Sequence, residues 1–208
     1  MLGYYNYTVI LTYMGTLAGF LGIAYISNGN MKMALLCLIY AGICDMFDGK
    51  IASTMKRTAK EKKFGIQIDS LSDLICFGAL PALIVFRCGG GGAVVHLLIG
   101  AGYLLCALIR LAWFNVDEEE RQNTSDGARD AYRGLPVTAS ALILPLFLGG
   151  GLLFGAPLHI IAPCLALCMA VAFLTPFRIK KPKLAGKVVL IGFGFMELVI
   201  VLLGGVRA

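Results

Sequence analysis

Charged side chains are scarce in this sequence, and so are the side chains that bind metals through nitrogen or sulfur. Asp, Glu, Lys and Arg make up only 14% of the 208 residues, whereas a soluble domain carries about 25%. There are two histidines, and the seven cysteines form no CxxC pair. This composition excludes an ordinary soluble enzyme, a disordered chain and a disulfide scaffold, and it predicts buried, unpaired thiols.

Apolar residues take the place of the missing charge. They make up 59% of the chain, and the mean hydropathy is +0.83. A membrane-crossing helix needs about 20 apolar residues. We therefore expect an all-α integral membrane protein, a polytopic bundle of about seven transmembrane helices in a single domain that spans residues 1–208. The apolar runs that predict these helices are Val9–Ile26, Met33–Phe47, Ile66–Phe86, Ala93–Val116, Leu135–Gly155, Pro157–Phe177 and Val188–Val206.

The basic residues predict how the bundle is oriented. The net charge is +6, and all Lys and Arg residues except Lys32, Arg87 and Arg207 fall in the connections after the second, fourth and sixth apolar runs or, for Arg110, at the edge of one of them. With seven crossings these connections lie on one side, and the positive-inside rule places that side and the N-terminus in the cytoplasm. We expect the basic loops to meet anionic lipid heads of the cell membrane and not nucleic acid.

Four aspartates stand within or at the ends of the second and third helices, where an unpaired carboxylate is costly. A charged side chain at bilayer depth costs roughly 2.5–3.5 kcal/mol. Asp45 and Asp48 are spaced i, i+3, and Asp69 and Asp73 are spaced i, i+4, so each pair lies on one face of its helix. Because a cytoplasmic connection joins the two helices, the pairs meet at the same end of the bundle.

Four converging carboxylates without a companion histidine or cysteine form an all-oxygen site. Mg²⁺ and Mn²⁺ prefer such ligands, and two ions suit four carboxylates better than one. Gly49, Ala52 and Gly65 leave backbone bare where a bulky ligand can approach, and the surrounding basic side chains favour a pyrophosphate as that ligand. The alternative is that the carboxylates only pair with nearby basic residues, namely Lys56, Arg57, Lys60 or Lys63.

These residues also carry a resemblance. The sequence reads Asp45-Met-Phe-Asp48-Gly49-Lys-Ile-Ala52 and then Gly65-Ile-Gln-Ile-Asp69-Ser-Leu-Ser-Asp73. It resembles the signature of the CDP-alcohol phosphotransferases, D-x-x-D-G-x-x-A-R, a spacer, and G-x-x-x-D-x-x-x-D. The resemblance covers about residues 8–145. Between Gly65 and Pro81 it is strongest to the branch of the family that uses CDP-diacylglycerol and L-serine.

The resemblance implies an enzyme that transfers the phosphatidyl group from CDP-diacylglycerol to L-serine and releases CMP. It implies that Asp45, Asp48 and Asp69 hold two divalent ions, Mg²⁺ or Mn²⁺. Asp73 is then a neighbour of the metals and the general base for the serine hydroxyl, a role for which a carboxylate in hydrogen-bond reach is suited. Gly49 is expected to lie with Ala52 against the cytidine diphosphate. A homodimer surrounded by membrane lipids is also implied.

Two departures from the family pattern bear on phosphate binding. Ser53 stands where the signature has arginine, and the spacer after it is longer than usual. Lys56 or Arg57, one turn further on, is expected to supply the missing contact. Arg110 and Arg133 flank the connection after the fourth apolar run. Each is a candidate partner for the serine carboxylate or a lipid phosphate, or else a helix-end residue placed by the positive-inside rule.

Two other functions remain open at this stage. A member of the same family can use a different acceptor alcohol, such as glycerol 3-phosphate or inositol, and the basic loops are compatible with a phosphorylated acceptor. A small cation or proton-coupled transporter also keeps carboxylates inside the membrane. Against a transporter, the four aspartates gather at one membrane face, and the sequence shows no inverted repeat.

Overall fold

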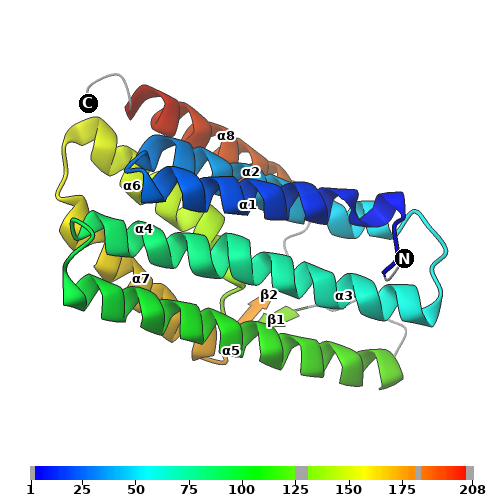
Figure 1. The fold of residues 1–208 in the computed structure, drawn as a ribbon. Helices are drawn as coiled ribbons and strands as arrows, with labels where there is room; N and C mark the ends of the chain where they lie inside the picture. Colours follow the sequence, from blue (N-terminus) through cyan, green and yellow to red (C-terminus); the bar gives the residue numbers. More distant parts are fainter. Residues whose placement is uncertain (1–2, 125–130, 181–183, 205–208) are drawn as a thin grey trace.

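The computed structural model describes residues 3–124, 131–180 and 184–204, and within them the side chains outside 122–133 and 178–191. Helices make up most of the molecule and lie side by side along one long axis (Figure 1). They are α1 (Ile10–Ser27), α2 (Met31–Ala52), α3 (Ala59–Asp73), α4 (Leu80–Cys88), α5 (Val94–Thr124), α6 (Ser140–Phe154), α7 (Leu158–Leu174) and α8 (Leu184–Gly204).

Helices α3 and α4 are two halves of one rod. A π-helical segment, Leu74–Ala79, joins them without a break. Counted this way, the described residues form seven helical rods, which confirms the predicted all-α polytopic bundle. Among the described residues, four stretches are long and apolar enough to cross a membrane, and α7 and the Gly192–Gly204 part of α8 are shorter apolar helices. The four are Tyr7–Ser27, Ala59–Cys88, Val94–Arg121 and Val137–Phe154.

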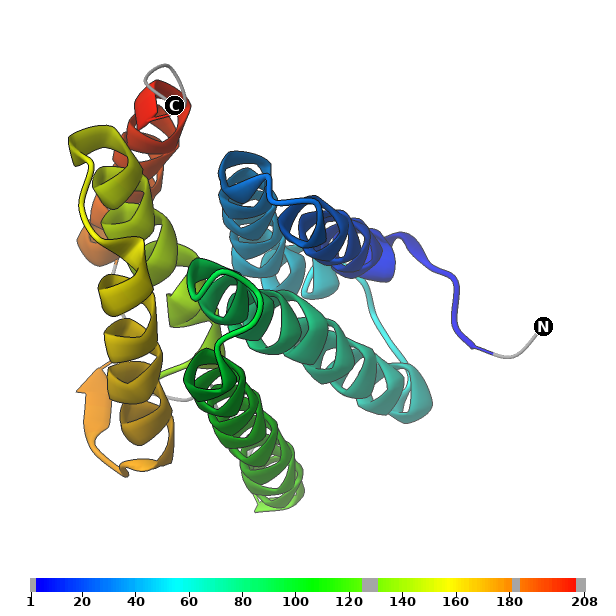
Figure 2. The same cartoon turned by 60° about the vertical axis from the view of Figure 1, so that its left-hand side comes forward.

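Successive rods run in alternating directions, so their connections gather at two opposite ends. In Figure 1 the N-terminal segment and the α2–α3 connection lie at the right, whereas the α4–α5 turn and the end of α8 lie at the left. The view turned by 60° shows α1 and α2 on one side of the molecule and α6, α7 and α8 on the other (Figure 2), with α2 packed directly against α6 and α8. The basic α2–α3 connection is therefore at the same end as the start of α1.

Small residues allow α1 and α2 to pack closely. A Cβ atom placed on Gly15 would lie 3.4 Å from the Cβ of Cys44, and one placed on Gly22 would lie 3.1 Å from the Cβ of Cys37. Close backbone approach at glycine is the usual way in which membrane helices gain packing contacts, since lipid provides no hydrophobic drive between helices. The seam brings the start of α1 against the end of α2, where two of the four aspartates lie.

Several helices are longer than their apolar runs predicted. Helix α2 continues to Ala52, and α3 begins at Ala59 after a capping box in which Thr58 and Glu61 bond each other's backbone N–H groups. Helix α5 continues to Thr124, beyond the end of the fourth apolar run at Val116. A periodicity of apolar residues misses such ends, because the helices there leave the apolar core of the bundle and carry polar side chains.

Two further findings differ from the sequence expectations. The connections before α6 and after α7 pair as short antiparallel strands, β1 (Ala131–Arg133) and β2 (Arg178–Lys180), with Arg133 opposite Arg178. All seven cysteines are free, as expected. The expectation that they are buried is confirmed only for Cys44 and Cys76. It is wrong for Cys164 and Cys168, which are exposed on α7, and the other three are partly buried. An exposed thiol is compatible with an apolar helix face that meets lipid.

Candidate active site

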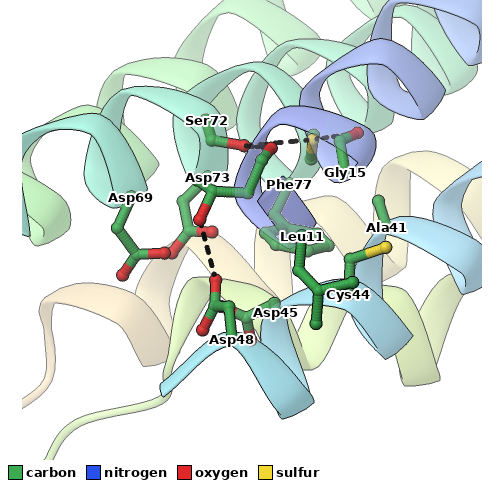
Figure 3. A pocket seen from close by; sticks show the side chains of 12 residues that line it. Leu11, Gly15, Ala41, Cys44, Asp45, Asp48, Asp69, Ser72, Asp73 and Phe77 are labelled. Atoms are coloured by element: carbon green, nitrogen blue, oxygen red, sulfur yellow. Dashed lines mark hydrogen bonds between the residues drawn. The ribbon is translucent and has the colours of Figure 1, made fainter. Parts of the chain in front are cut away.

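The four aspartates do converge at one pocket. Asp45 and Asp48 come from the last turns of α2, and Asp69 and Asp73 from the last turns of α3. Figure 3 shows the two pairs pointing toward a common space between the helices. One oxygen from each of Asp45, Asp48 and Asp69 lies within 4.8 Å of the others. Asp73 lines the same pocket but is not part of this tight group of three.

Helix α1 closes the pocket from a third side. Leu11, Thr12 and Gly15 line it, together with Cys76 and Phe77 from the π-helical segment, and the walls enclose about 190 Å³ of space including the part open to solvent. The Thr12 hydroxyl donates a hydrogen bond to Asp48 Oδ2 at 3.4 Å. These contacts tie the start of α1 to the aspartate helix pair.

A second set of hydrogen bonds fixes α1 against α3. The Thr16 hydroxyl lies 2.7 Å from the Ser72 hydroxyl, and Ser72 donates to the backbone carbonyl of Thr12 at 3.4 Å. On the far side of α3, the Ser70 hydroxyl donates to Asn115 Oδ1 of α5 at 2.7 Å. Sequence analysis missed these side chains as site residues, although Ser70 and Ser72 stand between the two motif aspartates of α3.

The donor set fits a divalent cation. Each pair of carboxylate charges 4.8 Å apart repels by about 3.5 kcal/mol at an effective dielectric constant of about 20. Among the side chains that the structure describes, no lysine or arginine forms an ion pair with these aspartates, and Lys63 pairs instead with Glu119 at 2.8 Å. The alternative of simple ion pairing is therefore not what the structure shows. Clustered oxygens with no cationic partner are the ligands that Mg²⁺ and Mn²⁺ prefer.

The residues expected to bind substrate lie beside this cluster, at the end of α2 and the start of α3. Nothing lies within 4 Å of a Cβ placed on Gly49, so the backbone there is open. Ser53 is exposed, and its hydroxyl donates to the Lys50 carbonyl at 2.6 Å, in the C-terminal turn of α2. Ala52, the last residue of α2, is partly buried.

Arg57 lies against the motif backbone of α3. A Cβ placed on Gly65 would lie 3.1 Å from the Arg57 Nη1 atom, so the guanidinium rests directly on this glycine. Its Nε atom is buried and has no hydrogen-bond partner in the described part of the chain. Lys56, by contrast, is exposed. The two candidates for the missing phosphate contact are thus placed very differently.

Arg110 is not brought to the aspartate pocket. Its side chain is 5% exposed, its Nε donates to the Leu135 carbonyl at 3.1 Å, and its guanidinium lies over the Trp113 ring at 5.3 Å. The interpretation of Arg110 as a helix-end residue is wrong, because α5 continues for several turns beyond it. The side chain of Arg133 lies outside the described residues; its backbone is in β1.

The sequence of this chain matches a known protein family. The profile of the CDP-alcohol phosphatidyltransferases matches residues 5–175. The chain belongs to this family. The matched region holds the six rods from α1 to α7, and in the described part of the chain α8 is the one helix beyond it. A six-helix core plus one further helix agrees with the fold predicted from the sequence.

Relatives within the family are similar over part of their length. A CDP-diacylglycerol–serine O-phosphatidyltransferase of Helicobacter pylori is 32% identical over 143 residues, which cover 68% of this chain and 56% of the relative. An archaetidylserine synthase of Methanothermobacter thermautotrophicus is 28% identical over 138 residues, or 66% and 55% of the two chains. The Saccharomyces cerevisiae CDP-diacylglycerol–serine O-phosphatidyltransferase is 37% identical over 109 residues, or 51% and 38%. The chain spans about half the length of the relatives it matches, or less.

Proposed function

We propose that this chain transfers the phosphatidyl group of CDP-diacylglycerol to L-serine, with phosphatidylserine and CMP as products. The observation that carries the proposal is the cluster of three carboxylates within 4.8 Å of one another, in a chain of the CDP-alcohol phosphatidyltransferase family. Relatives named for transfer to serine support serine as the acceptor. A pocket between membrane helices also suits a substrate whose acyl chains stay in the bilayer.

Asp45, Asp48 and Asp69 are the residues that would hold two divalent ions, Mg²⁺ or Mn²⁺, with Asp73 beside them. When bound, such ions neutralise the negative charge that develops on a pyrophosphate and its leaving group. The three carboxylates supply only oxygen ligands, and Thr12 orients one of them through its hydrogen bond to Asp48. This division leaves Asp73 available for proton transfer.

Asp73 is proposed as the general base. As the serine hydroxyl oxygen attacks the lipid-bearing phosphorus, a new P–O bond forms and the bond from that phosphorus to CMP breaks. The hydroxyl proton passes to a carboxylate oxygen of Asp73, and the bonding electrons leave with CMP. Asp73 lines the pocket next to the carboxylate cluster, which is the position that such a base requires.

The backbone and basic side chains at the end of α2 and the start of α3 are proposed to hold the nucleotide. Gly49 offers open backbone, and the neighbouring Ala52 adds little bulk. Arg57, seated on Gly65 with an unpartnered Nε, is proposed to make the phosphate contact that Ser53 lacks the charge to make. Arginine is suited to this task because its guanidinium binds phosphate oxygens in pairs.

We also propose the orientation and assembly that the sequence predicts. The N-terminus and the aspartate pocket face the cytoplasm, because the basic α2–α3 connection lies at that end of the bundle. The protein is proposed to sit in the cell membrane as a homodimer. Labelling of Lys62 and Lys183 from the two sides of sealed vesicles tests the orientation, since both are expected to react only from the cytoplasmic side.

One assay separates the possible functions. The purified chain receives CDP-diacylglycerol, Mn²⁺ or Mg²⁺ and one alcohol at a time: serine, glycerol 3-phosphate or inositol. CMP release with serine alone, abolished by a chelator and restored by excess metal, is expected. Release only with another alcohol would keep the transfer chemistry and replace the acceptor. No release with any alcohol from folded protein would refute the proposal and favour an ion transporter.

A further inference from the structure

The rod that carries Asp69 and Asp73 changes its geometry immediately after Asp73. Residues Leu74–Ala79 form a π-helix, and the Leu80 N–H donates to the carbonyl of Ile75, five residues earlier. A π turn accommodates one residue more than an α turn. Compared with an uninterrupted α-helix, it therefore rotates α3, which carries the aspartates, by about 100° relative to α4.

Pro81 gives a physical reason for this interruption. It lies at the start of α4 and has no N–H to donate. In a continuous α-helix residue 81 would donate to the carbonyl of Phe77, and the proline ring would clash with that carbonyl. The chain thus leaves the Phe77 carbonyl without its α-helical donor, inside the bundle and away from water. Phe77 itself is 1% exposed.

A side chain from another helix supplies the missing donor. The Tyr103 hydroxyl of α5 donates to the Phe77 carbonyl at 2.8 Å. Tyr103 is 1% exposed, and its ring packs against Phe173 of α7 with centroids 5.4 Å apart. A typical intramolecular hydrogen bond contributes about 0.5–1.5 kcal/mol to stability, and no water is expected to replace the hydroxyl in this packed position.

Phe77 connects this hydrogen bond to the aspartates. It lies one turn after Asp73 on the same helix face, and its side chain lines the aspartate pocket. Fixing the Phe77 backbone against α5 therefore fixes the helix face from which Asp69 and Asp73 project toward α2. A shift of this face changes the distances between the α3 carboxylates and those of α2.

We infer that Tyr103 is a positioning residue for the metal-binding aspartates. Its hydroxyl substitutes for the backbone donor that Pro81 lacks, and so stabilises the π turn that sets the direction of Asp69 and Asp73. The inference rests on the proposed function where it concerns metal binding. The local hydrogen bond and its effect on the π turn stand apart from that function.

The test compares two tyrosines that lose only a hydroxyl. Tyr103→Phe keeps the ring and its contact with Phe173. Tyr25→Phe is the matched control in α1, where the hydroxyl makes no hydrogen bond to the described residues. Binding of Mn²⁺ to the full chain in detergent is followed by electron paramagnetic resonance, without substrate. Tyr103→Phe is expected to weaken Mn²⁺ binding by about three- to tenfold, and Tyr25→Phe by less than about twofold.

Hydrogen exchange supplies a readout that does not depend on metal. The peptide that covers Leu74–Ala82 is expected to exchange faster in Tyr103→Phe than in the wild type or in Tyr25→Phe. If the wild type binds no Mn²⁺, the proposed function loses its metal site, while the exchange comparison still decides the role of Tyr103. Unchanged exchange of this peptide in Tyr103→Phe would overturn the inference in either case.

A second substitution tests the link to the proline. Pro81→Ala restores a backbone donor near the Phe77 carbonyl, so loss of the Tyr103 hydroxyl should matter less in that background. We expect the effect of Tyr103→Phe on Mn²⁺ binding to fall below about twofold in the Pro81→Ala chain. Equal effects in both backgrounds, or a lower melting temperature with unaltered Mn²⁺ binding, would mean that Tyr103 only packs the bundle. If Pro81→Ala fails to fold, the comparison with Tyr25→Phe decides.

Discussion

Removing one charge from the carboxylate cluster should stabilise the metal-free protein while it destroys metal binding. Asp45→Asn keeps the shape of the side chain, and no hydrogen bond of Asp45 is lost in the described structure. With three carboxylate oxygens within 4.8 Å of one another, the substitution removes two pairwise repulsions. Each is about 3.5 kcal/mol at an effective dielectric constant of about 20 when both groups are ionised, and partial protonation and solvent lower the net gain to about 1–3 kcal/mol.

The gain can be measured as a shift in melting temperature. For a protein of this size, 1 kcal/mol corresponds to roughly 2–4 °C. In the presence of a chelator, Asp45→Asn is therefore expected to melt about 2–12 °C higher than the wild type. When Mn²⁺ is added, the wild type should gain stability by mass action, and Asp45→Asn should gain little. As Mn²⁺ is added, the melting temperature of the wild type should therefore approach or exceed that of Asp45→Asn.

The matched control is Asp117→Asn, which makes the same chemical change on α5 outside the pocket. It should leave the Mn²⁺-dependent stabilisation intact, because it removes no carboxylate of the cluster. The reasoning is refuted if Asp45→Asn melts below the wild type in chelator and is still stabilised by Mn²⁺ as the wild type is. That result would mean that the carboxylates are held apart by other contacts and that the metal binds elsewhere.

Three further substitutions test the remaining roles. Asp73→Asn should lower kcat by about 10²–10⁴-fold with Mn²⁺ binding retained; normal turnover would exclude it as the base. Arg57→Ala should raise the KM for CDP-diacylglycerol about tenfold or more, whereas Lys56→Ala should change it less than about threefold. Equal effects of the two substitutions would contradict a phosphate contact by Arg57. Arg110→Ala removes a buried hydrogen bond and a contact with Trp113, so it should cost about 2–4 kcal/mol of stability. An unchanged melting temperature with lost activity would assign Arg110 to substrate binding instead.

Much of the site follows from spacing alone. Because Asp45 and Asp48 are i, i+3 and Asp69 and Asp73 are i, i+4, the helical repeat puts each pair on one face. The hydrophobic runs then require the end of α2 and the start of α3 to lie on the same side of the membrane. What spacing does not give is the distance between helices. The 4.8 Å group of three, with Asp73 outside it, depends on how α1 packs through Gly15 and Thr12.

The parts that the sequence predicted poorly are those where helix formation does not rely on apolar periodicity. Helix α3 starts at Ala59 because Thr58 and Glu61 cap it, a signal present in the sequence but outside the apolar run. The long end of α5 is supported by the Glu118–Arg121 ion pair, at i, i+3 spacing. Neither contact needs lipid. Both contacts are made by polar side chains outside the apolar runs, so a search for membrane-spanning segments does not find these helix ends.

The π turn limits how far the aspartate motif can be extended by simple helical counting. From Asp69 through Asp73 to Phe77, steps of four residues stay on one face, and all three residues do line the pocket. Beyond Phe77 the same counting is off by about one residue, or about 100° of rotation, because Pro81 prevents an uninterrupted α-helix. A sequence-based extension of the pocket into α4 would therefore choose the wrong face. The proline that causes this error is also the visible signal for it, since a proline inside a long apolar helix leaves one carbonyl in need of another donor, here the hydroxyl of Tyr103.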